Sequence, residues 1–517
     1  MASPSPLRRS ARASLGSAAI GLLALLAGCA QYAEQLAPAS PNEPWQQGRK
    51  TTTSLLPQEP AAPRSGPVDF GVRGNPEVTV LPPPPEVKAG KVYPLPELID
   101  LAARHNPTTR TAWEQARQAA LAVGIAESTF LPTISANVIG GRQENVTPVD
   151  VLGVRRDIDT TVSGVSTAVA LQWLVFDFGQ RKAAVEVAKR VLEAANVNFN
   201  GAHQLLIFNV TRTYYQYGAA QTRTEIAGQS LKNSGAILEA AVARERKGLG
   251  TTVEVAQARQ QLAQSELRQV VAEGQQRDAY QALLAAMSVS PTLNIKVANS
   301  GRRRLPAPAD VSTDEMVREA LARRPDVLAA YANMKAGEAG IDVATTDFLP
   351  KVFLAGVAAQ GSNDFNVASL PTLGQQTTAT GVLIGAAVPI YDGGLRAANL
   401  KAAESRAAVA RAAFTKTQEE AVREMVVASN TLRSALASHR AANKLTDAAS
   451  ITYEAALDAY RNGLGTVTAA TAADSGLLDA RQARADAHAA SLIAAANLAF
   501  VLGAMTSERA AVNLPYR

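Results

Sequence analysis

The strongest constraint in this sequence is an internal duplication. The motif Phe-Leu-Pro begins at Phe130 and again at Phe348, an offset of 348 − 130 = 218 residues. The motif Gly-Leu-Gly-Thr begins at Gly248 and again at Gly463, an offset of 463 − 248 = 215 residues. The motifs keep their order between the two copies, and a repeated unit of this length is an architectural module. The sequence therefore predicts one pseudo-symmetric body built from two copies rather than several unrelated domains.

Each copy begins with the periodicity of a helix and then changes to that of a strand. An early proline in each helix, Pro107 or Pro325, predicts a break because proline lacks the amide donor. The alternating segments that follow are about 10 to 14 residues long, which suits tilted transmembrane β-strands. Helices are expected at 98–128 and 313–346, strands at 133–141, around Val165 to Val175, at 351–361 and at 378–390, and loops at 142–161 and 362–377.

A turn of aspartate and glycine ends the second strand of each copy. Asp177 is followed by Gly179, and Asp392 is followed by Gly393 and Gly394. A short turn of this kind converts a strand into a helix, and the aspartate can accept hydrogen bonds from the first free helical N–H groups. We interpret both aspartates as structural caps rather than as catalytic residues.

Very long helices without proline follow in both copies. They are expected at 183–246 and 397–461, and each is on the order of 95 Å long at the helical rise per residue. Apolar and alanine residues at three-and-four spacing favour coiled-coil packing between neighbouring helices. Shorter return helices are expected at 253–287 and 467–504. A soluble globular domain has no use for rods of this length.

The Gly-Leu-Gly-Thr motif predicts a tight turn between each long helix and its return helix. Glycine adopts the positive φ that ends a helix, and threonine caps the helix that follows. The two predicted tips consist of Gly248, Leu249, Gly250 and Thr251 in the first copy and Gly463, Leu464, Gly465 and Thr466 in the second.

The N-terminus has the features of a secretion signal. Three arginines within the first twelve residues precede an apolar stretch at 18–27, which is too short to span a bilayer as a helix. The stretch ends in Leu-Ala-Gly-Cys at Cys29, the only cysteine of the chain. This sequence resembles a bacterial lipobox, which implies cleavage before Cys29, its acylation and, with Ala30 next, delivery to the outer membrane. The alternative is a plain secretory signal with an incidental cysteine.

The rest of the chain divides at its compositional boundaries. After the signal peptide at 1–28, a proline-rich tether occupies 29–94. The first structural repeat is expected at 95–295, a linker at 296–312, the second repeat at 313–510 and a tail at 511–517. No later segment has 18 or more uninterrupted apolar residues, so the sequence predicts no helical membrane span.

Composition and motifs exclude several classes of function. The net charge of +6 comes without the basic clusters and interleaved aromatics that a nucleic-acid partner would need. The four histidines, His105, His203, His439 and His488, are far apart in sequence and show no metal-ligand spacing. No nucleophile elbow or phosphate-binding loop is present. The sequence predicts no enzyme, no cofactor and no metal.

Strand pairs at one end of paired long helices, twice in one chain and with an acyl anchor, resemble the TolC family of outer-membrane efflux proteins, in particular its lipidated OprM-like branch. The resemblance covers about 95–510. It implies an α+β fold that is mostly α, assembled as a trimer. Each protomer would contribute four strands to a 12-stranded transmembrane β-barrel and its helices to a periplasmic coiled-coil barrel. Trimerisation would also close the strand edges that a single chain leaves open.

The resemblance also implies a passive conduit in the outer membrane. The expected partners are a periplasmic adaptor protein, an inner-membrane pump of the RND or ABC type and outer-membrane lipid. The two tips would dock the adaptor and close the aperture. Family members carry acidic residues just past the tip that ring the aperture, which makes Glu254 and Asp474 the candidates here; Ala469 replaces the acid at the second position that matches Glu254. Glu254 could equally serve only to favour a helix N-terminus.

Three readings compete on the sequence alone. The first is a channel for small-molecule and drug efflux. The second is the same channel in a type I polypeptide secretion system. The third is a lipid-anchored periplasmic coiled-coil scaffold without a pore, which explains the helices and Cys29 but not two strand pairs of membrane-spanning length.

Overall fold

The computed structural model describes Val72 and residues 74–79, 87–88, 90–151, 154–301, 303–306, 314–367 and 371–505. The chain divides into two compact units, Met1–Pro83 and Pro84–Arg517. In the first unit the described element is a 3-10 turn, η1, at Pro76–Thr79. The predicted signal peptide, the predicted lipidation site at Cys29 and the predicted tail at 511–517 lie outside the described residues. Both copies of the repeat lie in the second unit.

Two short helices open each copy, and both pairs break at the predicted prolines. They are α2 (Leu95–His105) and α3 (Pro107–Ser128) in the first copy and α6 (Asp314–Leu321) and α7 (Pro325–Thr346) in the second. Pro107 and Pro325 stand at the first position of α3 and α7, where a missing N–H leaves no hydrogen bond unmade. The Asn106 side chain caps α3 by accepting from the backbone N–H of Thr108 at 2.8 Å and of Thr109 at 3.2 Å.

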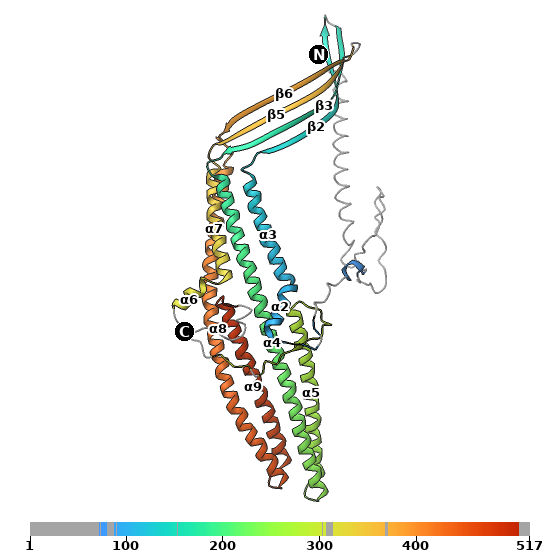
Figure 1. Cartoon of the computed structure of the whole chain (residues 1–517), viewed down its shortest axis with the longest axis vertical. Coiled ribbons are helices and arrows are strands. Elements are labelled where there is room, and N and C mark those ends of the chain that lie inside the picture. Colours follow the sequence, from blue (N-terminus) through green and yellow to red (C-terminus); the bar gives the residue numbers. More distant parts are fainter. Residues whose placement is uncertain are drawn as a thin grey trace, which may run out of the picture. The chain divides into compact units, whose positions relative to one another are not determined.

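The predicted long helices and their return helices are confirmed. They are α4 (Gln180–Arg246) and α8 (Leu395–Arg461), with 67 residues each, and α5 (Thr252–Ala286) and α9 (Val467–Val501), with 35 residues each. Helix α4 contacts α3 and α7 along its first part and α5 and α9 along its last part, while α8 contacts α7 and α9 (Figure 1). Among the described helices, none combines the length and apolarity needed to cross a bilayer.

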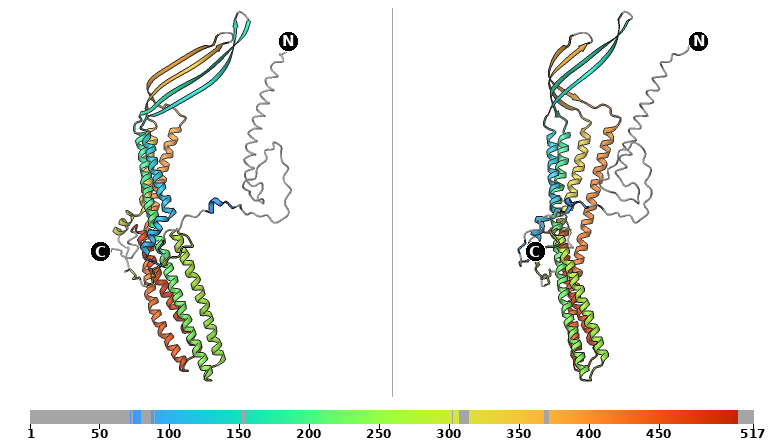
Figure 2. Two further views of the ribbon diagram at one scale, coloured as in Figure 1. Left: turned by 45° about the vertical axis from the view of Figure 1, so that its right-hand side comes forward. Right: turned by 90° about the vertical axis from the view of Figure 1, so that its right-hand side faces the viewer.

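Four strands form one antiparallel sheet at the end of the helices opposite the tips (Figure 2). They are β2 (Thr133–Val151), β3 (Val154–Phe176), β5 (Lys351–Val367) and β6 (Leu373–Ala387). The order is β2-β3-β5-β6, so the two copies meet at the pairing of β3 with β5. Strands β2 and β6 each pair with one neighbour within the described residues, which leaves two open edges.

The predicted loops at 142–161 and 362–377 are wrong, because the strands continue through most of both segments. Arg142 pairs with Ser163 and Glu144 with Thr161 in an unbroken ladder that reaches Val151. The last predicted strand also ends earlier than expected, at Ala387 instead of residue 390. These segments are polar, and a polar composition is typical of loops. Hairpin pairing satisfies the backbone hydrogen bonds whatever the side chains are, so a solvated strand can have the composition of a loop.

The largest core lies where α2, α4 and α5 surround a small parallel ladder of β1 (Val92–Tyr93) and β4 (Lys296–Val297). Tyr215, Leu98 and Leu283 are fully buried there, and Tyr214 and Tyr217 pack beside them. The chain after β4 passes so close to α4 that a Cβ at Gly218 would overlap the hydroxyl of Ser300.

Candidate functional site

The first tip closes with the geometry that its glycines and threonine predict. Gly248 has φ +71°, a left-handed conformation that glycine adopts without strain. The Leu249 N–H donates to the Arg244 carbonyl at 2.9 Å, the long-range hydrogen bond of a Schellman helix end. The Thr251 hydroxyl accepts from the Glu254 N–H at 3.3 Å and so caps α5. The predicted turn and cap are confirmed.

The second tip repeats this geometry. Gly463 has φ +80°, the Leu464 N–H donates to the Ala459 carbonyl at 2.8 Å, and the Thr466 hydroxyl accepts from the Ala469 N–H at 3.2 Å. The two turns are therefore equivalent in backbone and cap, although the residues that flank them differ.

The second glycine of each tip lies close to the end of the preceding helix and does not have a positive φ. A Cβ at Gly250 would lie 3.1 Å from the Cβ of Arg244, and a Cβ at Gly465 would lie 3.2 Å from the Cβ of Ala459. Leu249 and Leu464 stand between the glycines with 66% and 87% of their surface exposed. Each tip thus presents one apolar side chain on a turn in which a side chain at the second glycine would crowd the end of the preceding helix.

Side chains from the first copy hold Tyr460 of the second copy. The Tyr460 hydroxyl donates to the Glu254 carboxylate at 3.0 Å. The Arg244 guanidinium lies 5.2 Å from the centre of the Tyr460 ring and donates through Nη1 to the Tyr460 carbonyl at 3.1 Å. Tyr460 is fully buried. These contacts fasten the end of α8 to the ends of α4 and α5.

The surroundings keep Tyr460 protonated. Burial, then the hydrogen bond to Glu254, then the charge of that carboxylate raise the pKa of Tyr460 to about 12, although the Arg244 cation opposes the shift. The hydroxyl is therefore a permanent donor at physiological pH. Glu254 itself is half-buried and engaged by this donor, so its expected place on an aperture stays a prediction.

Asp474 lies inside the protomer, which contradicts its expected place on an aperture in this arrangement of the helices. It is fully buried. One carboxylate oxygen accepts from Asn233 at 3.0 Å, and the other accepts from Ser230 at 3.2 Å and from Ser234 at 3.0 Å. All three donors belong to α4, so the carboxylate joins α9 to α4 instead of facing water. Sequence reasoning identified the residue but assigned it to the wrong surface.

The first strand-to-helix turn is built around an arginine that the prediction overlooked. Asp177 accepts from the backbone N–H of Gly179 at 3.2 Å and of Arg181 at 2.9 Å, which confirms its capping role. The Arg181 guanidinium donates to Asp177 at 2.8 Å and to the carbonyls of Thr129 at 3.0 Å and Leu174 at 2.6 Å. It therefore ties the end of β3, the end of α3 and the start of α4 together.

The second turn repeats the arrangement with fewer contacts. Asp392 accepts from the N–H groups of Gly394 and Arg396, both at 3.1 Å. The Arg396 guanidinium donates to Asp392 at 2.6 Å and to the Pro389 carbonyl at 2.8 Å. An arginine four residues after each aspartate, at the same offset of 396 − 181 = 215, was the signal that could have revealed both.

Both capping aspartates are held in the ionised form. Burial of Asp177 opposes ionisation, but hydrogen bonds from the Arg181 backbone and guanidinium outweigh it and lower the pKa of the carboxyl. The hydrogen bond from Arg396 is the main cause that lowers the pKa of Asp392. Structural ion pairs perturb carboxyl pKa values as active sites do, and here every partner is structural.

The histidines show an unexpected contact. The rings of His439 and His488 lie with centroids 5.5 Å apart, although the residues are 49 positions apart in sequence (488 − 439). His105 and His203 are not part of this pair. No group of three or more potential metal ligands occurs in the parts of the chain that the structure describes.

Comparison with known proteins identifies the family. The outer membrane efflux protein family matches residues 98–289 and 316–504, one stretch in each copy. Protein CyaE of Bordetella pertussis is 28% identical over 80% of this chain and 85% of its own length. The pyoverdine export outer membrane protein OpmQ of Pseudomonas putida is 27% identical over 54% of this chain and 60% of its own length. The structure of the Campylobacter jejuni CmeC outer membrane channel covers 82% of this chain and 90% of its own, with a TM-score of 0.67 and 18% identity, and shows the same fold.

The resemblance drawn from the repeated motifs is confirmed at the level of family and fold, while membership of the lipidated OprM-like branch stays a prediction. The family match extends over most of the chain and includes both copies of the duplicated unit. This chain therefore belongs to the outer membrane efflux protein family.

Proposed function

We propose that this protein is the outer-membrane channel of a tripartite export system, a passive conduit that carries small molecules from an inner-membrane pump and a periplasmic adaptor across the outer membrane. The observation that carries the proposal is the family match over both copies of the duplicated unit. Similarity to a pyoverdine export protein favours small-molecule cargo. The conduit has no catalytic role in this proposal, because transport through it needs no bond to be made or broken.

The sheet supports a place in the membrane. Large apolar side chains lie exposed on its strands, among them Ile134 and Val138 on β2 and Val382 and Ile384 on β6. Apolar side chains in such numbers on one protomer's strands need lipid or a partner to cover them. The open edges of β2 and β6 need partners as well. A homotrimer in which three four-stranded sheets join into a 12-stranded barrel meets both needs.

Conductance tests the channel directly. Purified protein reconstituted in planar bilayers is expected to conduct ions in discrete steps, and deletion of the gene is expected to raise susceptibility to exported compounds. A homogeneous, folded preparation that never conducts would instead support the scaffold without a pore. Genes next to this one that encode an ABC exporter and a secreted polypeptide would shift the cargo to type I secretion.

The tips support adaptor docking. Gly248, Leu249, Gly250 and Thr251, with their counterparts Gly463, Leu464, Gly465 and Thr466, form two equivalent turns that each expose one leucine. Leucine substituted at both Gly250 and Gly465 should distort the turns and weaken export in cells. Gly124→Leu on α3 is a matched control, because a Cβ there meets nothing within 4 Å. Wild-type export by the Gly250→Leu/Gly465→Leu variant would remove the tips from the docking surface.

Glu254 remains the candidate for an aperture ring, with one carboxylate per protomer. Its half-buried position next to the tip supports this place. Glu254→Gln should reduce the preference of the open channel for cations, which reversal potentials measure in a salt gradient. An unchanged reversal potential would leave Glu254 only the role of holding Tyr460.

Lipidation at Cys29 is the remaining proposal on membrane attachment. The lipobox resemblance supports it, and several buried acyl chains anchor a protein firmly, at about 0.8 kcal/mol per CH₂. Mass spectrometry should find acyl chains on Cys29 in membrane-extracted protein. Cys29→Ser should lose them and still purify as a trimer; a monomeric variant would mean that the anchor contributes to assembly.

A further inference from the structure

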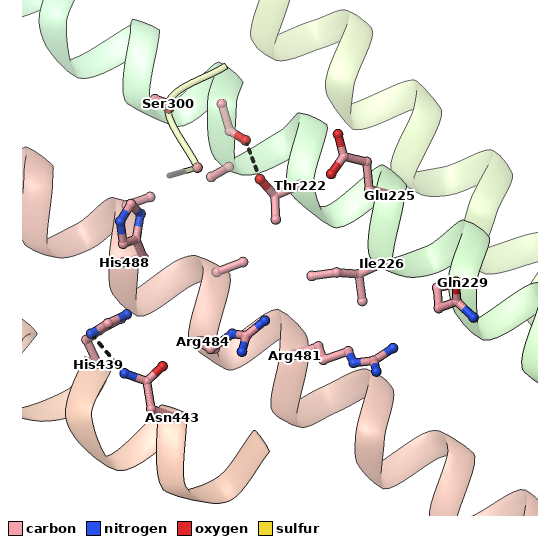
Figure 3. A pocket seen from close by; sticks show the side chains of 15 residues that line it. Thr222, Glu225, Ile226, Gln229, Ser300, His439, Asn443, Arg481, Arg484 and His488 are labelled. Atoms are coloured by element: carbon pink, nitrogen blue, oxygen red, sulfur yellow. Dashed lines mark hydrogen bonds between the residues drawn. The ribbon is translucent and has the colours of Figure 1, made fainter. Parts of the chain in front are cut away.

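A cavity of about 460 Å³ lies between α4, α8 and α9, next to the segment that follows β4 (Figure 3). Thr222 and Ile226 of α4 line one wall, and Arg481 and Arg484 of α9 extend toward that wall from the other side. His439 of α8 and His488 of α9 close one end. The cavity thus collects four nitrogen-rich side chains from two helices of the second copy and faces them with a helix of the first copy.

The two arginines are unpaired. Among the described residues, neither Arg481 nor Arg484 makes a hydrogen bond or an ion pair, whereas their neighbour Arg223 on α4 is paired with Asp486 at 2.7 Å. Glu225 is the one carboxylate that lines the cavity; it is exposed and bonds to neither arginine. Two guanidinium groups one helical turn apart therefore offer their donors to the same space without an acceptor from the described chain.

The two histidines are hydrogen-bonded to different partners beside the cavity. Nε2 of His488 lies 2.9 Å from the Arg303 carbonyl, and a carbonyl only accepts, so this nitrogen carries a proton. Nδ1 of His439 lies 3.4 Å from the Asn443 amide nitrogen, which donates to it. Burial, the neighbouring His488 and the Arg484 cation lower the pKa of His439. Repulsion from these neighbours disfavours the imidazolium form of His439, and an anion bound beside it would relieve that repulsion.

The rest of the lining combines apolar side chains with polar ones such as Thr222, Gln229 and Asn443. Ile226 points into the cavity from α4, and Ala485 and Ala489 lie along α9 beside the arginines. An inorganic anion would satisfy the guanidinium groups but leave this wall empty. A molecule that carries an oxyanion on a compact apolar body would fill both parts.

We propose that this cavity is a binding site for a small molecule with an oxyanion group, a carboxylate, sulfonate or phosphate, which Arg481 and Arg484 bind while Ile226 and the alanines contact its apolar part. Because the lining comes from α4 on one side and α8 and α9 on the other, the bound molecule bridges the two copies of the repeat. Binding therefore stabilises the packed arrangement of α4 and α9 by mass action. The site does not depend on what the protein exports.

Calorimetric titration of the assembled protein in detergent, at low ionic strength, tests the site. Benzoate is the organic anion used as the probe, and inorganic phosphate is an oxyanion without an apolar part. Benzamide and benzylamine are the neutral and cationic analogues of benzoate and serve as controls. Benzoate is expected to bind and to raise the unfolding temperature, with benzamide and benzylamine at least about tenfold weaker. Phosphate as tight as benzoate would assign the site to free oxyanions and not to an organic ligand. No binding by either anion, or tighter binding of benzylamine, would overturn the proposal.

Substitutions locate the binding. Arg481→Gln together with Arg484→Gln is expected to weaken benzoate at least about tenfold, because each removes a charge-assisted hydrogen bond. Arg440→Gln is the matched control, since Arg440 is exposed on α8 next to His439 but does not line the cavity. Arg481→Lys together with Arg484→Lys retains the positive charge and should bind benzoate more tightly than the glutamine variant does. Equal binding by the glutamine variant and the wild type would place the anion elsewhere.

The histidines add a pH signature that a merely structural role would lack. A bound anion favours imidazolium, so binding takes up protons and benzoate should bind more tightly at pH 6 than at pH 7.5. The groups that face the cavity are Glu225 of α4, His439 of α8, and Arg481, Arg484 and His488 of α9. Glutamine at both histidines should remove the dependence. A dependence that persists in that variant would exclude the histidines from the site.

Discussion

The two tips have the same backbone conformation, but their flanking side chains differ at the positions that contact the other copy. Both turns have glycine in the left-handed region and a threonine cap. The first copy carries Arg244 and Glu254, and at the offset of 215 the second carries Ala459 and Ala469. The charged pair of the first copy binds Tyr460 of the second. Residues that shape the turn are thus repeated, whereas residues that contact the other copy are not.

The same distinction holds further along the helices. Asp474 of α9 accepts three hydrogen bonds from α4, but its counterpart in the first copy, at 474 − 215 = 259, is the exposed Arg259. Identical subunits must use one surface twice, because any change occurs in both. Fusion of the copies into one chain removes that requirement. One copy can then supply a donor and the other an acceptor.

The largest effect is expected from removal of the buried carboxylate that joins the copies. Asp474→Ala leaves Ser230, Asn233 and Ser234 without their acceptor in a site that excludes water, at a cost of about 2–4 kcal/mol. Arg259→Ala removes an exposed side chain and should change stability by less than about 0.5 kcal/mol. Urea unfolding followed by circular dichroism measures both. Equal losses of unfolding free energy in the two variants would mean that Asp474 and Arg259 contribute equally to stability despite their different burial.

The junction arginines should rank next. Arg181→Gln removes charge-assisted hydrogen bonds to Asp177 and to three backbone carbonyls and should cost about 2–3 kcal/mol. Arg396→Gln removes one to Asp392 and one to a single carbonyl, so its loss should be smaller. Thermal unfolding of the two variants in the same detergent gives the ranking. A larger loss in Arg396→Gln than in Arg181→Gln would show that the second junction contributes more to stability than its hydrogen bonds indicate.

A weaker coupling is expected at the tip. Tyr460→Phe and Glu254→Gln should each destabilise the packing of the tips, and the double variant should show a coupling of about 0.5–1.5 kcal/mol. The coupling comes from a double-mutant cycle on unfolding free energies. Strict additivity would indicate that the hydroxyl and the carboxylate do not interact in solution.

The smallest expected effect is on how stability depends on pH in the acid range. Both capping aspartates have a pKa below the ordinary value, so their contribution is complete above the pKa of the unfolded chain, near 3.8, and is lost as the pH falls through the folded value. Wild-type unfolding temperature should therefore fall more steeply below about pH 4 than that of Asp177→Asn. The same slope in both proteins would assign acid sensitivity to other carboxyls.

Local features of this fold were predictable, whereas contacts between distant segments were not. The helix ends at Gly248 and Gly463 and the breaks at Pro107 and Pro325 follow from the conformational range of single residues. The composition of 142–161 predicted a loop wrongly, because polar side chains indicate that a segment is exposed to solvent but do not indicate whether its backbone is paired. Nothing local distinguishes a buried Asp474 from a lumenal one, since its donors lie about 240 positions earlier in the chain.

The candidate sites follow the same rule. Asp177 and Asp392 were recognised as caps because the capping N–H groups are within four residues. The cavity around Arg481 and His439 escaped notice because its walls come from three helices and a loop. A repeated arginine after each aspartate could have been found by aligning the copies. Such an alignment would not have revealed the cavity residues, because at the offset of 215 Arg481 and Arg484 correspond to Glu266 and Gln269 and are not repeated.

The equal lengths of corresponding helices restrict how a chain like this can grow or shrink. Helices α4 and α8 have 67 residues each, and α5 and α9 have 35 residues each. An insertion of one residue in a single helix would displace its end by about 1.5 Å and rotate it by about 100° relative to its neighbours. A change in the length of one helix therefore requires a compensating change in each of the other three. Designers who wish to alter the reach of this protein should edit all four helices by the same number of turns.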